Sequence, residues 1–397
     1  MPRYISISKA FEAAFGRAPE AIGFAPGRVE VLGNHTDYNG GLVLSVALEL
    51  GVTVAAARHP SDPEALELRS EAAGETRRFR IDDEAPERGA WTSYIRGVLR
   101  EIRRRGTALR GLQVLVDSSL PMGAGVSSSA ALELATAEAV FDLLGGRPDD
   151  LMEEAQLCQR AEVEFVGVPC GLLDQFSSAF GRKDHALFLD ASTLDHRRIP
   201  LGRSDLSIVL ADTLEKHALV DGKYAALRAS CERAARSLGT ALGRRVEKLR
   251  SVTLEEFLEH RDAVDPEDRP RAEHVIREND RVLRGALALE AGEHAELRRL
   301  MLESHASSRD LLGNSTPALD LLVEVASRLP GFQGGKLTGG GFGGSTVNLV
   351  ETGRVEAFSA ELERAFIEKL GRPPALIRSR VGDGARVIRS SRERRAP

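Results

Sequence analysis

Hydrophobic and polar residues follow both strand-like and helical patterns in the first half of this chain. Residues 41–57 are rich in β-branched and other apolar side chains and predict strands, whereas residues 91–105 carry apolar side chains at helical spacing. Residues 127–144 predict a helix that starts in serines and stops at two glycines. Residues 151–165 predict a further helix. The first half therefore mixes strands and helices without strict alternation.

The second half is more helical and more charged. Its pattern predicts alternating strand and turn over 185–201, a short strand over 207–211, helices over 224–306, strands over 341–350, a helix over 355–370 and a last strand over 375–387. We place a boundary near residue 200, which gives domains 1–200 and 201–397. The predicted fold class is α+β.

Composition narrows the possible partners. A chain of 397 residues is long enough for two cores. Its 54 basic and 59 acidic residues give a net charge of −5, which argues against a dedicated nucleic-acid binder. No apolar run approaches 18 residues and the N-terminus lacks the apolar core of a signal peptide, so we expect a cytoplasmic protein with no membrane partner. A monomer, or at most a weak dimer, is expected.

Two features that could carry chemistry or contacts are weak. The three cysteines have no paired spacing, so neither a disulfide framework nor a zinc site follows. The basic segment 389–397 could be an interaction arm, but its composition favours a frayed, solvated terminus.

Three glycine-rich segments carry most of the chemical information. They are PGRVEVLGNHTDYNGG (26–41), LPMGAGVSSSA (120–130) and KLTGGGFGGSTVNL (336–349). The middle segment leads into a predicted helix, whose unpaired N–H groups and positive dipole end suit a phosphate. The first segment gathers polar side chains that could hold a polyhydroxylated substrate, namely Arg28, Asn34, His35, Asp37 and Tyr38. Together they predict phosphoryl transfer to a small molecule.

The middle loop fits neither of two common phosphate-binding motifs. No G-x-x-x-x-G-K-[ST] is present, which excludes a Walker loop. Gly123 and Gly125 begin a dinucleotide motif, but Ser128 replaces its third glycine and glycines stand where an acidic residue is needed. The serines at the helix start offer N-caps, phosphate donors and a Mg²⁺ ligand. A plain serine-capped helix remains the alternative for the loop alone.

The three segments, in this order, resemble the motifs of the GHMP small-molecule kinases. LPMGAGVSSSA resembles the ATP-binding loop of that family, and PGRVEVLGNHTDYNGG resembles the galactokinase signature G-R-x-N-L-I-G-E-H-x-D-Y. Residues 162–181 and 303–310 also fit the galactokinase branch. The resemblance spans about residues 22–350. It implies a two-domain α+β fold, with an N-terminal α/β domain of a type also found in a ribosomal protein, a ferredoxin-like C-terminal domain and the active site between them.

The resemblance also implies roles for individual residues. Asp174 would take, or help remove, the proton of the sugar's anomeric hydroxyl, and Arg28 would keep that carboxylate ionised and favour the developing alkoxide. Glu162 and Ser129 would bind Mg²⁺ together with ATP phosphates and waters. For Glu162, a solvated helix face is the alternative, because other glutamates lie close in sequence.

Further residues follow from the same motifs. The predicted ATP-binding residues are Pro121, Gly123, Ala124, Gly125, Val126, Ser127, Ser128, Ser129, Gly340 and Gly341. The predicted sugar-binding residues are Arg28, Asn34, His35, Asp37, Gly171, Asp174 and Tyr224. Trp91 and Tyr94 could line an adenine pocket, with core packing of their helix as the simpler alternative.

The chain departs from the galactokinase signature at two positions. Asn34 stands where the family has glutamate, and Glu30 where it has asparagine. In the family, that glutamate contacts the C6 hydroxyl of the sugar, while the aspartate matched by Asp37 holds the C3 and C4 hydroxyls. An amide both donates and accepts hydrogen bonds, so tolerance at C6 could widen to galacturonate or L-arabinose. Rotation of Glu30 into the vacated role is the alternative.

The predicted function is an ATP-dependent sugar 1-kinase, with galactose as the first substrate. The other class considered is a sugar and ATP sensor without turnover. Sensors of that type carry a shortened serine-rich loop, whereas residues 127–130 are intact here and Asp174 is present. The first motif also disfavours a mevalonate or homoserine kinase.

Overall fold

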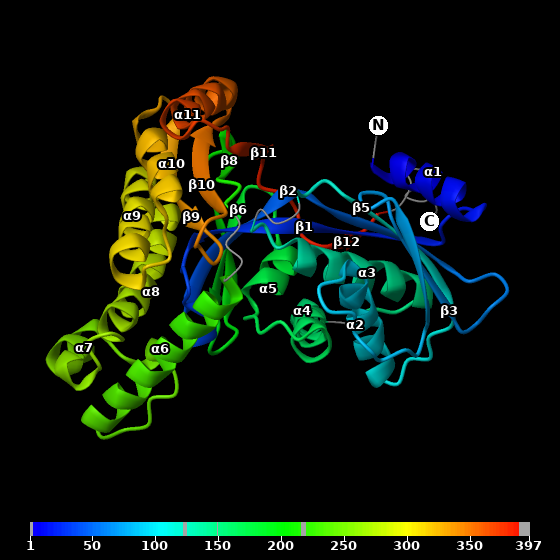
Figure 1. Ribbon diagram of the computed structural model, residues 1–397, viewed down its shortest axis with the longest axis horizontal. Helices are drawn as coiled ribbons and strands as arrows, with labels where there is room; N and C mark the ends of the chain where they lie inside the picture. The colour runs from blue at the N-terminus through cyan, green and yellow to red at the C-terminus, as the bar shows by residue number, and fades with distance from the viewer. Residues whose placement is uncertain (1–2, 122–124, 149, 216–219, 389–397) are drawn as a thin grey trace.

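Two β-sheets with helices packed on them organise the chain (Figure 1). The computed structural model describes residues 3–121, 125–148, 150–215 and 220–388. Within these residues the first sheet has the order β12-β1-β2-β5-β3-β4, and β6 and β7 extend from β2. Its strands are β1 (Ala21–Leu32), β2 (Leu42–Arg58), β3 (Ala65–Ser70), β4 (Glu75–Arg80), β5 (Leu112–Ser118), β6 (His185–Asp190), β7 (His196–Pro200) and β12 (Arg386–Val387).

Helix α3 is the central support of this sheet. It runs from Ser128 to Leu144, buries most of its side chains and lies against β1 and β2. The approach is close at Gly23, where an added Cβ would lie 2.2 Å from the carbonyl oxygen of Ala135. The remaining helices of this part are α1 (Arg3–Phe15), α2 (Trp91–Arg104), α4 (Leu151–Arg160) and α5 (Leu173–Phe180). A π-helical turn, Ala161–Val166, continues α4.

The second sheet has the order β11-β8-β10-β9 in the described residues and is antiparallel throughout. Its strands are β8 (Leu206–Asp212), β9 (Phe332–Thr338), β10 (Ser345–Glu351) and β11 (Ala375–Ser379). Its helices are α6 (Val220–Ala241), α7 (Leu254–His260), α8 (Arg269–Glu290), α9 (His294–Ser307), α10 (Pro317–Arg328) and α11 (Val355–Leu370). Helix α9 packs on β9, and α8 packs on α9 while also reaching β1 and β2 of the first sheet.

Several predicted elements agree with the structure. Strand β2, helices α2, α3 and α11, and strand β8 all begin and end within two residues of their predicted bounds. The predicted strand over 375–387 is wrong as one element, because β11 pairs with β8 whereas β12 pairs with β1 in the other sheet. The hairpin β3–β4 and the strand character of β1 were not predicted.

The division between the sheets falls between β7 and β8, at residues 200–206. The crossing of β12 back to the first sheet means that a single cut near residue 200 does not separate the two parts.

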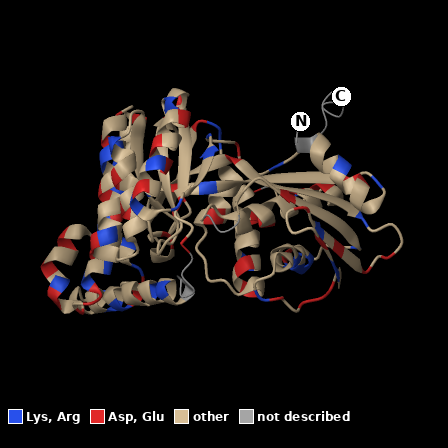
Figure 2. Cartoon of the chain, turned by 45° about the horizontal axis from the view of Figure 1, so that its top comes forward, with Lys and Arg blue, Asp and Glu red and all other residues tan. Residues whose placement is uncertain are grey.

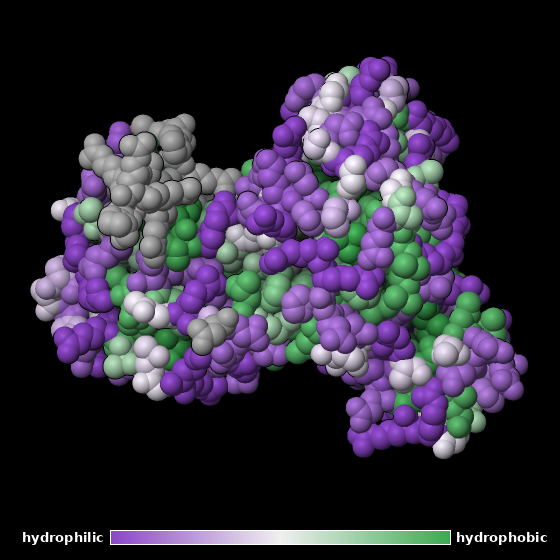
Figure 3. Space-filling view, turned by 180° about the vertical axis from the view of Figure 1, so that it is seen from behind, coloured by the Kyte–Doolittle hydropathy of each residue, from purple (hydrophilic) through white to green (hydrophobic). Residues whose placement is uncertain are grey.

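The surface is charged and mixed in sign. Acidic and basic residues alternate over both halves (Figure 2), and the face seen from behind is largely hydrophilic with small apolar patches (Figure 3). Among the residues that the structure describes, no helix is both long and apolar enough to cross a membrane.

Candidate active site

Arg28 and Asp174 form the centre of the site. Arg28 lies on β1 and is 7% exposed, and Asp174 lies in the first turn of α5. The Arg28 guanidinium donates to Oδ1 of Asp174 from Nε at 2.8 Å and from Nη2 at 2.6 Å. Its Nη1 donates to the carbonyl oxygen of Gly125 at 2.9 Å. One arginine therefore connects the predicted catalytic carboxylate to the predicted ATP loop.

Ser127 holds the other oxygen of Asp174. Its hydroxyl donates to Oδ2 at 2.6 Å, and its backbone has a left-handed conformation with φ 57°. The expectation that this serine caps α3 is wrong, since its side chain makes no cap hydrogen bond although it occupies the N-cap position. A side chain that caps a helix accepts from its first N–H groups with backbone angles typically in the β region, whereas Ser127 is left-handed, which accounts for the missing cap bond.

Glu162 and Ser129 are brought together beside this pair. The Ser129 hydroxyl hydrogen-bonds the Glu162 carboxylate. Burial, aided by the charge of Asp174, raises the pKa of Glu162 to about 7. Gln175 donates to Oε2 of Glu162 at 2.7 Å, and Cys170 approaches it at 3.5 Å. Glu162 is 5% exposed, so it does not lie on a solvated helix face.

This carboxylate and hydroxyl fit a magnesium ion that also takes oxygen atoms from ATP and water. Mg²⁺ uses few protein ligands in nucleotide sites. The described part of the chain contains no cluster of three His, Cys, Asp or Glu side chains suited to a metal. The raised pKa of Glu162 also shows that its charge has little compensation from neighbouring groups.

Among the predicted sugar-binding residues, Gly171 lies against Asp37 and Tyr224 lies against His35. An added Cβ at Gly171 would lie 2.1 Å from Oδ2 of Asp37, so only glycine fits there. Burial raises the pKa of Asp37 to about 6, and the charges of Asp174 and Glu30 contribute. The Tyr224 ring from α6 packs on the ring of His35 with centroids 5.1 Å apart.

His35 is fixed through both ring nitrogens. Nδ1 lies 2.9 Å from the Tyr38 hydroxyl, and Nε2 lies 3.1 Å from the carbonyl oxygen of Gly340. A carbonyl only accepts, so Nε2 carries the proton and Nδ1 accepts from Tyr38. Burial lowers the pKa of His35 to about 4, which keeps the ring neutral near pH 7.

Asn34 is placed differently from the expectation of a direct sugar contact. Its side chain is bound by protein groups: Nδ2 donates to the carbonyl oxygen of Gly339 at 2.9 Å, and Oδ1 accepts from Asn314 at 2.9 Å and Ser308 at 3.2 Å. The residue is 1% exposed. In this arrangement the amide joins the first and third glycine-rich segments.

Glu30 forms a buried ion pair. Its Oε1 lies 2.7 Å from Nζ of Lys336 on β9, and both side chains are buried. The alternative that Glu30 rotates toward the place of the missing glutamate therefore requires the loss of this ion pair.

The remaining predicted ATP residues occupy varied positions. The Val126 carbonyl accepts from the backbone N–H of Arg28 at 3.1 Å, Ser128 is the first residue of α3, and Pro121 lies in the preceding loop. Gly340 and Gly341 pack against Asn314, whose Nδ2 donates to the Gly340 carbonyl at 3.2 Å. Gly123 and Ala124 lie outside the described residues.

Three buried polar residues on α8 were not predicted from the sequence: His274, Glu278 and Arg281. Glu278 and His274 hydrogen-bond the backbone at Gly33 and Asn34, and Arg281 pairs with Glu278. They lie in a charged helical region with no motif. Only the unusual burial of charge on one face could have identified them.

Trp91 and Tyr94 belong to the packed face of α2. Both pack against the main hydrophobic core, and Trp91 Nε1 donates to Glu75 at 2.9 Å. Burial raises the pKa of Tyr94 to about 12. These contacts favour the packing interpretation.

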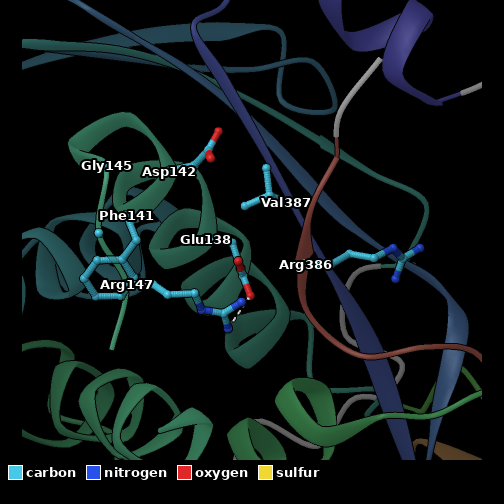
Figure 4. A pocket seen from close by; sticks show the side chains of 8 residues that line it. Glu138, Phe141, Asp142, Gly145, Arg147, Arg386 and Val387 are labelled. Atoms are coloured by element: carbon cyan, nitrogen blue, oxygen red, sulfur yellow. Dashed lines mark ion pairs between the residues drawn. The ribbon is translucent and has the colours of Figure 1, made fainter. Parts of the chain in front are cut away.

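A cavity of about 480 Å³ lies elsewhere, at the far end of α3 (Figure 4). At 1.5 Å per residue, this helix separates it from the serine loop by about 25 Å. Arg147 lies 3.0 Å from both Glu138 and Glu154 there. The lining residues are Glu138, Phe141, Asp142, Gly145, Gly146, Arg147, Arg386 and Val387. The cavity shares no residue with the site around Asp174.

Family comparisons match this geometry over most of the chain. Residues 9–58 match the galactokinase galactose-binding signature, residues 93–182 the N-terminal domain of GHMP kinases and residues 286–368 their C-terminal domain. A galactokinase of Chloroflexus aggregans is 40% identical over 390 residues, covering 98% of each chain. Human galactokinase is 39% identical over 388 residues, covering 96% of this chain and 95% of its own.

Solved structures agree. The crystal structure of Lactococcus lactis galactokinase complexed with galactose superposes with a TM-score of 0.89 at 31% identity, covering 96% of this chain and 98% of that one. Mevalonate kinase of Methanococcus jannaschii, at 17% identity and a TM-score of 0.65, shares the fold.

Proposed function

This chain belongs to the galactokinase family, and we propose that it transfers the γ-phosphoryl group of ATP to the anomeric hydroxyl of D-galactose, giving α-D-galactose 1-phosphate and ADP. The observation that carries this proposal is the position of Asp174. Its carboxylate is held by Arg28 from β1 and by Ser127 from the serine loop, next to the polar loop of residues 33–38.

The chemistry follows from these contacts. Asp174 accepts, or electrostatically assists the loss of, the proton of the attacking hydroxyl. Arg28, which donates to Oδ1 of Asp174, favours negative charge on the sugar oxygen. Ser129 and Glu162 would hold Mg²⁺, which would supply charge neutralisation at the ATP phosphates. Positioning of the two substrates does the rest, so no covalent protein intermediate is needed.

We assign the sugar to the side of the site formed by His35, Asp37, Gly171 and Tyr224. A neutral His35 offers no charge to a sugar, while Asp37 is available as an acceptor for adjacent hydroxyls. The involvement of Asn34 is indirect, because its amide bonds Gly339 and Asn314.

A second candidate substrate class consists of galactose analogues altered at C6, namely galacturonate and L-arabinose. The observation in favour is that position 34 offers no carboxylate, while the Glu30 carboxylate is paired with Lys336. A negatively charged C6 substituent would therefore meet less repulsion than beside a glutamate.

The test measures ATP-dependent formation of the 1-phosphate from five sugars: galactose, galacturonate, L-arabinose, N-acetylgalactosamine and glucose. Asp174→Ala is the control. Turnover of galactose above the other sugars supports the proposal, and a preference for a C6-altered sugar supports the second class. Sugar binding without turnover of any of them would favour a sensor. We further propose a cytoplasmic monomer, at most weakly dimeric, whose partners are the sugar and ATP.

A further inference from the structure

Glu278 of α8 is a buried carboxylate that hydrogen-bonds the backbone of the loop of residues 33–35. Its Oε1 accepts from the backbone N–H of Gly33 at 2.9 Å and of Asn34 at 3.3 Å, and from the Ser304 hydroxyl at 2.6 Å. Its Oε2 accepts from Arg281 at 2.5 Å. The side chain is fully buried. A residue of the second half of the chain therefore hydrogen-bonds the backbone N–H groups of a loop from the first half.

The charge of Glu278 is maintained at this buried position. Burial by itself works to raise its pKa, but the charge of Arg281, with contributions from His274 and Lys336, holds the pKa down at about 2. A charged acceptor forms hydrogen bonds roughly twice as strong as a neutral one. The contact with the loop therefore involves a full negative charge near neutral pH.

The loop needs such a partner because its backbone is unusual. Gly33 has φ 107° and His35 has φ 60°, so a left-handed residue stands on each side of Asn34. A non-glycine residue in this region is sterically strained. His274, one turn before Glu278, completes the contact, since its Nε2 lies 3.0 Å from the Asn34 carbonyl oxygen.

This conformation decides where the sugar-side groups lie. His35 follows Asn34 directly, and its ring is aimed at Tyr38 and the Gly340 carbonyl. Asp37 lies two residues further along. A change in the backbone at 33–35 would move both side chains, while the serine loop and Glu162 lie on other elements.

We propose that Glu278 is a positioning residue for sugar recognition: it fixes the 33–35 backbone so that His35 and Asp37 face the substrate. The inference rests on the proposed function and extends it to a residue outside the sequence motifs. It makes the affinity for the sugar depend on α8 more directly than the affinity for ATP, because the 33–35 backbone reaches the predicted ATP residues only through the contacts of Asn34 and His35 with Gly339 and Gly340.

The test compares Glu278→Gln with a matched control. Glutamine has the same shape, but with its oxygen toward the loop its NH₂ faces Arg281, and in the other orientation its NH₂ faces the loop N–H groups. We expect the KM for galactose and the Kd for galactose measured by calorimetry without ATP to rise about 10-fold or more. The KM for ATP should change less than about twofold.

Asp268→Asn is the control. Asp268 is also a buried carboxylate, at the N-terminus of the same helix, but it binds Ser230 at 2.7 Å and Arg233 at 2.6 Å. A loss of stability with an unchanged KM for galactose is expected. An equal rise of the galactose KM in both variants, or no rise in Glu278→Gln, would overturn the proposal.

A milder variant covers the case in which Glu278→Gln does not fold. Ser304→Ala removes one hydrogen bond to the same oxygen and should raise the galactose KM about twofold to fivefold. An unchanged galactose KM in this soluble variant would then refute the proposal. The parent protein is measured first, because its failure to bind or phosphorylate galactose would instead refute the proposed function.

Discussion

Arg28 engages Asp174 through a single carboxylate oxygen, Oδ1, with two N–H donors at 2.8 and 2.6 Å. Ser127 donates to Oδ2 at 2.6 Å. A carboxylate has about four acceptor positions, so these three bonds leave one on Oδ2. The reacting hydroxyl of a sugar can therefore donate to Oδ2 without displacing either protein partner.

Replacement of Asp174 by asparagine should preserve the shape of the site and remove its negative charge. We expect kcat for galactose to fall about 10²- to 10⁴-fold, because the proton acceptor is lost. Calorimetric binding of galactose and a thermal melt will show whether the fold is retained. Retention of more than about a tenth of the parent kcat would exclude a catalytic role for this carboxylate.

Two substitutions at Ser127 separate its hydroxyl from its backbone. Ser127→Gly and Ser127→Ala both lose the bond to Asp174, but only glycine adopts φ 57° without cost. We expect both to lower kcat about 10- to 100-fold, the effect of a hydrogen bond to a charged group. Alanine should also lower the melting temperature relative to glycine. A normal kcat in the glycine variant would show that the hydroxyl is dispensable.

The sequence motifs identified the residues that lie around Asp174, but they did not identify the residues that support the loop of residues 33–35. Arg28, Ser129 and Glu162 were named from motifs that resemble those of the GHMP kinases, and the structure brings them near Asp174. Their chemical roles remain predictions. Local patterns succeed here because each motif combines a turn with the side chains that the turn presents.

The parts that escaped prediction depend on long-range pairing. Glu278 meets Gly33 across a sequence separation of 245 residues, and Lys336 meets Glu30 across 306. No periodicity reports such contacts. The buried amide of Asn34 was likewise unpredictable, because its partners Ser308 and Asn314 come from a π-helical turn and the segment after it.

Asp37 should give the enzyme an acid limb in its pH profile. Burial raises its pKa from 3.8 to about 6, so the carboxylate is ionised only above about pH 6. We expect kcat/KM for galactose to fall as the pH drops below 6. Asp37→Asn should have low activity without this limb. A parent profile that is flat between pH 5 and 7 would contradict the assignment.

The same shift predicts an opposite effect on stability. The unfolded chain releases the Asp37 proton at a lower pH than the folded protein, so the contribution of this group to stability falls as the pH rises from 3.8 to about 6 and does not change further above that. Asp37→Asn should therefore melt at or above the parent temperature at pH 8. A clearly lower melting temperature at that pH would show that the ionised carboxylate stabilises the fold.

Glu162→Gln should weaken the response to magnesium. The change removes the buried carboxylate that binds Ser129, and we expect about 10- to 100-fold more Mg²⁺ for half-maximal binding of ADP in calorimetry. Glu164→Gln is the control, since Glu164 is exposed and pairs with Arg104 at 2.7 Å. Equal Mg²⁺ dependence in both variants would remove Glu162 from the metal site.

Gly171→Ala should damage the sugar side selectively. The new methyl group would lie 2.1 Å from Oδ2 of Asp37, so the carboxylate or the loop must move. We expect the galactose KM to rise about tenfold or more, with the ATP KM unchanged. Gly146→Ala, where an added Cβ meets nothing within 4 Å, provides the neutral comparison. A normal galactose KM in the Gly171 variant would count against this side as the sugar pocket.

Strand β12 has a consequence for how the protein is made. It pairs with β1 at Gly23 and Phe24, so part of an early strand lacks this neighbour until residues 386–387 have been synthesised. The whole second sheet is synthesised in the interval. The first sheet, which is begun first, is thus completed after the second sheet. A truncation that removes residues 386–397 would take away a neighbour of β1, a strand made early in synthesis.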